Sequence, residues 1–97
     1  MLELEILGRA QDDIYDIIAY SMGAHGEIAA RAYIEKVRAR INWLRSNAKL
    51  GPVHSQLTVG FRSYRQGQHR IYYKAGAQTL TIVRVLHHSM DVEPQFE

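Results

Sequence analysis

Residues 60–91 have the sequence GFRSYRQGQHRIYYKAGAQTLTIVRVLHHSMD. Aromatic and β-branched residues dominate it, and small or polar residues interrupt it twice, which is typical of three short strands joined by tight turns. We predict strands at residues 60–65, 68–74 and 79–87, with a two-residue turn at Gln66-Gly67 and a four-residue turn at residues 75–78. The last strand is apolar on both faces except at Arg84, which predicts a central place in the sheet.

The same stretch is strongly unbalanced in charge. It contains five cations and no carboxylate before Asp91; the cations are Arg62, Arg65, Arg70, Lys74 and Arg84. A small sheet with such a positive field is expected to have an acidic partner, a polyanionic substrate or both. The whole chain carries a net charge of only +2, so the sequence indicates a local basic patch and not a generally basic protein.

The first half of the chain predicts one strand and two helices. Leu2, Leu4 and Ile6 alternate with other residues, the period of a half-buried strand. Apolar residues then recur at helical spacing from Ala10 to Ile18, and the sequence between Gly23 and Gly26 ends that pattern. A second apolar stripe predicts a longer helix over residues 27–46.

Two amphipathic helices joined by so short a link are expected to form an antiparallel hairpin. The predicted element order is therefore β-α-α-β-β-β. We expect an α+β fold in which the hairpin packs on one face of a small, mainly antiparallel sheet, with residues 1–97 as a single domain. Residues 47–58, which include Gly51-Pro52, form the longest predicted loop.

Several classes of site are disfavoured by composition. The chain of 97 residues has no cysteine, so it contains neither disulfides nor thiolate metal sites. No apolar run approaches the ~18 residues of a membrane span, and Glu3 and Glu5 stand where a signal peptide would carry basic residues. We expect a cytoplasmic protein that binds no cofactor, no metal and no membrane.

The turn at Gln66-Gly67 would pair Arg65 with Gln68 and Ser63 with Arg70. One sheet face would then carry Phe61, Ser63, Arg65, Arg70 and Tyr72, and the other would carry Arg62, Tyr64, His69, Ile71 and Tyr73. The first face suits a phosphate backbone or an acidic peptide. A solvated face with half-buried tyrosines is the second interpretation, and strand composition alone favours it.

His87 and His88 admit three interpretations. A metal site is disfavoured, because adjacent strand residues point to opposite faces and no carboxylate or third histidine lies at a useful spacing. General acid–base chemistry is open to them, since histidine titrates near neutral pH. A structural hydrogen bond at the strand end explains them equally well.

A family resemblance is carried by two parts of the chain. The predicted first strand is followed by Ala10, Asp12, Asp13, Ile17 and Tyr20, and the second half contains the strings GFRSY, HRIYYK and LTIVRVLHHSMD. Together these resemble the ParE branch of the RelE/ParE toxin superfamily, over residues 2–91. The resemblance implies the toxin of a bacterial type II toxin–antitoxin pair, which forms a hetero-oligomer with a small, ParD-like or other cognate antitoxin.

The resemblance implies different targets for the two branches. RelE-like members cleave mRNA on the ribosome, whereas ParE-like members are linked to inhibition of DNA gyrase. A nuclease would use Arg65, Arg70, His87 and His88. However, residues 51–60 contain His54 but no glutamate, and Ser89-Met90 stands where the nuclease pattern often has tyrosine. These departures favour the ParE branch.

Three hypotheses follow from this resemblance. The first is a toxin that inhibits gyrase by binding it, the second is a ribosome-dependent endoribonuclease, and the third is a degenerate toxin that retains only antitoxin binding. In each case we expect a cationic groove beside apolar surface to receive an acidic segment of the antitoxin. The residues expected to bind the antitoxin or the target are Arg62, Arg65, Arg70, Tyr72, Arg84, His87, His88 and Met90.

Overall fold

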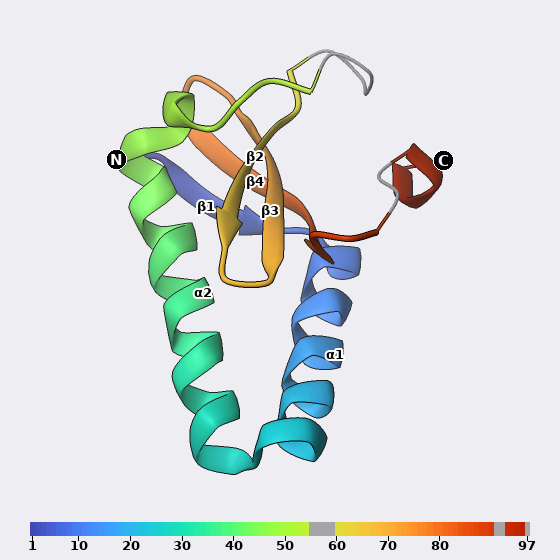
Figure 1. Ribbon diagram of the computed structural model, residues 1–97. Helices are drawn as coiled ribbons and strands as arrows, with labels where there is room; N and C mark the ends of the chain where they lie inside the picture. The colour runs from blue at the N-terminus through green and yellow to red at the C-terminus, as the bar shows by residue number, and fades with distance from the viewer. Residues whose placement is uncertain (55–59, 91–92, 97) are drawn as a thin grey trace.

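The computed structural model describes residues 1–54, 60–90 and 93–96 (Figure 1). Its strands and helices follow the predicted order. They are β1 (Glu3–Ile6), α1 (Gly8–His25), α2 (Glu27–Asn47), β2 (Arg62–Gln66), β3 (His69–Ala75) and β4 (Thr79–His87), with short 3₁₀ helices η1 (Ala48–Leu50) and η2 (Glu93–Phe96). The predicted loop at 47–58 begins with η1, and its residues 55–59 lie outside the described part.

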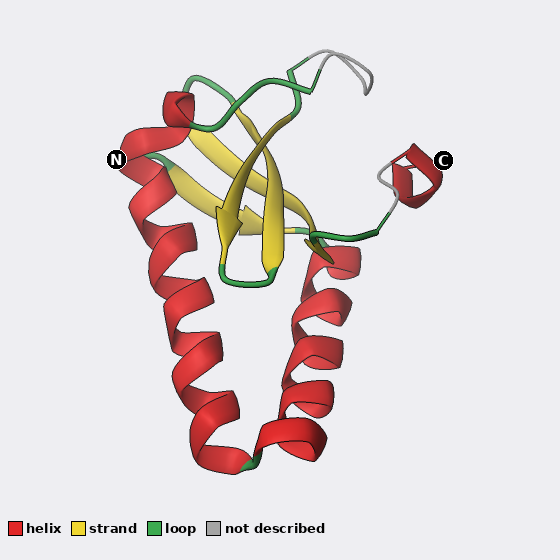
Figure 2. Cartoon of the chain, viewed as in Figure 1, coloured by secondary structure: helices red, strands yellow, loops and turns green. Residues whose placement is uncertain are grey.

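The four strands form one sheet in the order β1-β4-β3-β2. β1 is parallel to β4, and the two remaining pairs are antiparallel. The predicted α+β class, the mainly antiparallel sheet and the internal place of the last strand are therefore confirmed. The helices run antiparallel and join at the end farther from the sheet (Figure 2).

The helical hairpin forms because both helices bury a stripe of apolar residues. Gly26 separates them with φ 86°, a conformation that other residues avoid, and its amide donates to the Met22 carbonyl at the end of α1. The stripes of both helices meet the apolar side chains of β3 and β4 in one core, which contains Ile14, Ile17, Ile34, Val37, Ile41, Leu44, Ile71, Tyr73, Leu80, Ile82 and Val85.

The β2–β3 turn differs from the prediction. Gln66 pairs with His69 and Arg65 with Arg70, so the turn residues are Gly67 and Gln68, and the predicted pairs Arg65–Gln68 and Ser63–Arg70 are wrong. Of the two turn residues, Gly67 alone has a positive φ, 60°. A glycine with positive φ at the first turn position is the pattern of a type II′ turn. The pairing moved by two residues, so the assignment of side chains to faces is unchanged.

Tyr33 of α2 holds this turn against the helices. Its hydroxyl accepts a hydrogen bond from the Gln68 amide at 3.0 Å and lies 3.2 Å from the Gln66 carbonyl oxygen. The ring lies so close to Gly67 that a Cβ there would come within 2.7 Å of its Cε1 atom. Helix α2 and the hairpin turn therefore fit together only with glycine at this position.

A bulge in β4 was not predicted. Tyr72 pairs with Arg84 but Tyr73 pairs with Ile82, so Val83 is the extra residue. The bulge puts Ile82 on the helix side of the sheet and Arg84 on the other side.

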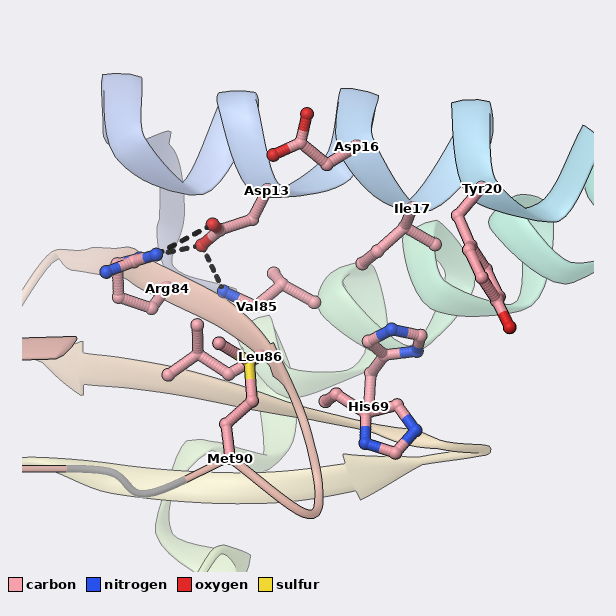
Figure 3. A pocket seen from close by; sticks show the side chains of 10 residues that line it. Asp13, Asp16, Ile17, Tyr20, His69, Arg84, Val85, Leu86 and Met90 are labelled. Carbon is pink, nitrogen blue, oxygen red and sulfur yellow. Dashed lines mark hydrogen bonds and ion pairs between the residues drawn. The ribbon is translucent and has the colours of Figure 1, made fainter. Parts of the chain in front are cut away.

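The edge of β4 beyond the bulge is closed by α1. β1 ends at Ile6, beside Ile82, and in the described part of the chain no other strand continues along that edge of β4. There the Asp13 carboxylate accepts bonds from Arg84 Nε at 2.7 Å, from Arg84 Nη2 at 2.8 Å and from the Val85 amide at 3.0 Å (Figure 3). The two side chains of the ion pair are only 10% and 12% exposed.

None of the helices in the described ranges is long and apolar enough to cross a bilayer.

We predict that Gly67→Ala destabilises the protein by about 2 kcal/mol, because it adds a left-handed-conformation penalty to the collision with Tyr33. Gly23→Ala is the matched control. Gly23 lies inside α1 with open space around it, so the same substitution should stabilise by about 0.5–1 kcal/mol. Denaturant unfolding of both variants measures the difference, and equal effects of the same sign would contradict the described turn.

We predict that Asp13→Ala lowers the free energy of unfolding by about 3 kcal/mol, since it leaves a buried guanidinium without its counter-ion. Asp13→Asn, which keeps an acceptor for the Val85 amide, should cost less. Asp12→Ala removes an exposed neighbouring carboxylate and should change stability by less than about 0.5 kcal/mol. Chemical denaturation measures all three, and a similar loss in the Asp12 and Asp13 variants would refute the role of the ion pair.

Candidate functional site

The face of the sheet away from the helices, here called the far face, gathers part of the predicted site. Arg65 and Arg70 are direct register partners next to the β2–β3 turn. Arg70 Nη1 donates to the Ser63 hydroxyl at 3.0 Å, and His54 Nε2 hydrogen-bonds to the same oxygen. The exposed Arg65 donates from Nε to the Gly67 carbonyl.

Two histidines border these arginines. Burial, followed by repulsion from Arg70, lowers the pKa of His54. Desolvation, followed by repulsion from Arg65, His87 and Arg70, lowers the pKa of His88. Both imidazoles are therefore mainly neutral at neutral pH and able to accept a proton, while the positive charge of this region comes from the arginines.

The far face can bind an anion, but its hydroxyl is not a nucleophile for a bound substrate. Ser63 is fully buried, and its oxygen is shared by His54 and Arg70. Among the described residues, β2, β3 and β4 contribute no carboxylate. The arrangement therefore offers two guanidinium groups and weakly basic imidazoles for contact with phosphate or carboxylate oxygens.

Three other predicted residues have partners within the chain. Arg62 donates from Nη1 to the Gly51 carbonyl at 2.8 Å, and Arg84 is held by Asp13. Tyr72 is 3% exposed, and its ring lies 5.3 Å from that of His54. The structure thus does not bring all of the predicted arginines to one surface.

His87 and His88 lie at the end of β4 and stack on each other, with ring centroids 4.6 Å apart. His87 also meets the edge of His69, its register partner, at 5.5 Å, and its Nδ1 lies 2.7 Å from the Ser89 hydroxyl oxygen. His88 is tied to the turn through its amide, which donates to the Gln68 carbonyl. The two imidazoles therefore connect the far face with the helix side of the sheet.

Two adjoining hollows lie on the helix side of this stack. The first, of about 370 Å³, runs between α1 and the end of β4; its lining includes Asp16, Ile17, Tyr20, Leu86 and Met90. The second, of about 630 Å³, lies between the helical hairpin and the β2–β3 turn; its lining includes Tyr20, His25, Ala29, Tyr33, His69 and His87. Figure 3 shows Tyr20 and Ile17 of α1 opposite His69.

His69 is the central titratable group of the second hollow. Its Nδ1 atom lies 2.6 Å from the Tyr33 hydroxyl oxygen. Burial, followed by repulsion from His87 and His88, lowers the pKa of His69. When neutral His69 carries its proton on Nε2, its Nδ1 atom accepts the Tyr33 hydroxyl proton.

Sequence reasoning missed His54, His69 and Tyr33 as site residues. The alternation in β3 places His69 on the same sheet face as Ile71 and Tyr73, but nothing in the sequence indicates that Tyr33, 36 positions earlier, reaches it. His54 follows Gly51-Pro52 without periodicity. Within the described ranges, no group of three histidines or carboxylates is placed to hold a metal ion.

Comparisons with known proteins agree on one family. Residues 4–92 match the family described as the ParE toxin of the type II toxin–antitoxin system parDE. The chain is similar to Toxin ParE1 of Caulobacter vibrioides, with 32% identity and coverage of 86% of this chain and 85% of that one. Toxin ParE1 of Mycobacterium tuberculosis is 28% identical, over 87% of each chain.

Solved structures support the fold. A chain of the chromosomal ParDE system from P. aeruginosa superposes with a TM-score of 0.76 at 16% identity, covering 90% of this chain and 96% of that one. A chain of the RelBE2 complex from M. tuberculosis gives 0.60 at 20% identity, covering 90% and 98%. Because the family match spans nearly the whole chain and includes β1, the helical hairpin and the three-stranded meander, this protein belongs to the ParE toxin family of type II toxin–antitoxin systems.

Proposed function

We propose that this toxin acts by binding DNA gyrase and that a cognate antitoxin silences it by covering its surface. The observation that carries the proposal is the match of residues 4–92 to the ParE toxin family. That match covers the helical hairpin as well as the sheet. The resemblance noted above links this branch to gyrase rather than to the ribosome.

The chemistry of the far face supports binding over hydrolysis. Cleavage of RNA through its 2′-hydroxyl needs a base, an acid and stabilisation of charge on the phosphate. Arg65 and Arg70 supply the last of these. His54 Nε2 is engaged by the buried Ser63 hydroxyl, and no carboxylate of the described strands is present to orient a base.

The antitoxin is expected to be attracted by the same imbalance of charge. β2, β3 and β4 carry five cations and no acid, and only Arg84 is neutralised by a carboxylate within the described chain. An acidic segment can meet Arg65 and Arg70 through bidentate guanidinium–carboxylate contacts. Tyr20 and Met90, which are 73% and 41% exposed, line the hollow between α1 and the end of β4. They offer apolar surface to the same partner.

An endoribonuclease is the second candidate, and one arrangement favours it. His54 and Arg70 meet at the Ser63 oxygen, and the pKa of His54 is lowered by burial and by Arg70, so a neutral imidazole stands beside a phosphate-binding guanidinium. A base beside a group that stabilises charge on the phosphate supplies two of the three functions that this cleavage requires.

We expect purified toxin, freed of antitoxin, to inhibit supercoiling by DNA gyrase. The double substitution Arg65→Ala, Arg70→Ala should weaken inhibition roughly a hundredfold or more, because charged hydrogen bonds of this kind contribute about 1.5–3 kcal/mol each. Arg31→Ala is the matched control, since Arg31 is exposed on α2 and pairs only with Glu27. A supercoiling assay titrated with each protein measures this.

Undisturbed supercoiling at saturating toxin would remove the gyrase proposal. A primer-extension assay on translating mRNA tests the second candidate with the same protein. Uncut transcripts are the expected result. Codon-phased cuts that disappear in both Arg70→Ala and His54→Gln would replace the first proposal by the second.

A further inference from the structure

The hollow between the helical hairpin and the β2–β3 turn contains a hydrogen-bond arrangement with two alternative states. The Tyr33 hydroxyl has one proton and two lone pairs. It accepts from the Gln68 amide at 3.0 Å. Its own proton has two acceptors in reach, His69 Nδ1 at 2.6 Å and the Gln66 carbonyl oxygen at 3.2 Å.

With neutral His69, the hydroxyl donates to Nδ1. With protonated His69, Nδ1 becomes a donor to the Tyr33 oxygen, and the hydroxyl proton turns to the Gln66 carbonyl. The hydrogen bond between the Tyr33 oxygen and His69 Nδ1 persists in both states, with its direction reversed. His69 can therefore gain a proton at Nδ1 without losing that bond, and loss of such bonds is a usual obstacle to charging a half-buried histidine.

The surroundings of His69 contain little negative charge to compensate that proton. The hollow itself is lined by His25, His69 and His87 and by no carboxylate. The titratable groups that line the two hollows with His69 or act on its pKa include Asp16, Tyr20 and His25 of α1, Tyr33 of α2, and His87 and His88 at the end of β4. Arg65 and Arg70 act on Tyr33 or His88 from the far face.

Of these groups only Asp16 is a carboxylate, and it lines the first hollow together with His69 and His87. Asp13, the other carboxylate there, is committed to Arg84 and the Val85 amide. A proton on His69 thus adds a positive charge to a hollow in which the described residues place no carboxylate, and a carboxylate of a partner can meet it there. The apolar and aromatic lining, with Tyr20, Ala29 and Tyr33, suits the body of a protein segment.

We propose that this hollow is a proton-controlled docking site for a carboxylate-bearing segment of the cognate antitoxin, in which His69 gains the charge and Tyr33 reorients its hydroxyl to allow it. The inference rests on the proposed function in that it takes the antitoxin as the occupant. Beyond that function, it assigns a role to His69, a carboxylate to the antitoxin segment, and tighter binding at lower pH. It is independent of which cellular target the toxin has.

The sign of the pH dependence follows from linkage. In the free chain burial and the neighbouring imidazoles lower the pKa of His69, and a docked carboxylate raises it again. The complex therefore binds more protons than its separate components between those two values. Affinity rises as pH falls through that window, by at most about tenfold per pH unit for one proton.

The closing experiment uses the full chain and the antitoxin encoded beside it. NMR of the toxin with ¹⁵N-labelled histidine should show His69 as the Nε2–H tautomer at about pH 8, and antitoxin should raise its titration midpoint by about half a unit or more. Calorimetric affinity should increase about three- to tenfold from about pH 7.5 to 6. His69→Gln should flatten this slope, and His54→Gln, which changes a histidine of the far face, should retain it.

The outcomes separate this inference from the proposed function. An unchanged His69 midpoint on antitoxin binding, or the same slope in wild type and His69→Gln, overturns the inference while the toxin–antitoxin pairing stands. Because the midpoint is read in the unmodified chain, the test survives a variant that fails to fold. Absence of binding at every pH would remove the antitoxin pairing and this inference with it, whereas a negative supercoiling assay would leave both intact.

Discussion

The contact between Asp13 and the end of β4 determines how the two halves of this protein fit together. β1 has four residues and ends beside Ile82, whereas β4 continues to His87. Beyond that point the strand would expose an unpaired edge, which folded proteins generally cover. One carboxylate of α1 takes both the Val85 amide and the Arg84 guanidinium, so a helix replaces the missing strand at the cost of a single side chain.

This replacement explains why the hollows lie where they do. Since Asp13 fixes the start of α1 against β4, the later residues of α1 continue past the end of the strand (Figure 3). Ile17 and Tyr20 then face His69 and His87 across an opening that no strand fills. At the other side of the opening, Tyr33 fixes α2 to the β2–β3 turn. Two polar contacts, one from each helix, thus hold the frame of the candidate docking site.

The sequence was sufficient for the order of elements and for most of their bounds, because apolar spacing at periods of two and 3.6 is a local signal. It was insufficient where a contact between distant residues decides the outcome. The expected turn lies one residue early because glycine suits either position of a two-residue turn, and the Tyr33 ring that packs against Gly67 belongs to a distant helix. The Val83 bulge has no signal within LTIVRVL, whose residues would be equally apolar in a regular strand.

The same distinction applies to the candidate site. The cationic character of the second half could be read from composition, and Arg65 and Arg70 do lie together. The ion pair between Arg84 and Asp13 could not be predicted from the sequence, since 71 positions separate the two residues. Likewise the alternation groups His69 with Ile71 and Tyr73, but its importance arises from the Tyr33 hydroxyl and from the edge-to-face contact with His87.

On the proposed function, attraction and retention of a partner belong to different surfaces. Among the described residues, Arg62 and Arg65 donate to carbonyl oxygens and Arg70 to the Ser63 hydroxyl, so no carboxylate neutralises them. Such cations raise association rates more than they raise affinity. Affinity comes from desolvated contacts, which the aromatic hollow offers and the charged far face does not. The histidine stack joins the two surfaces, so a partner drawn in by the arginines meets His69 next, and the charge of that one imidazole then decides how firmly a carboxylate stays.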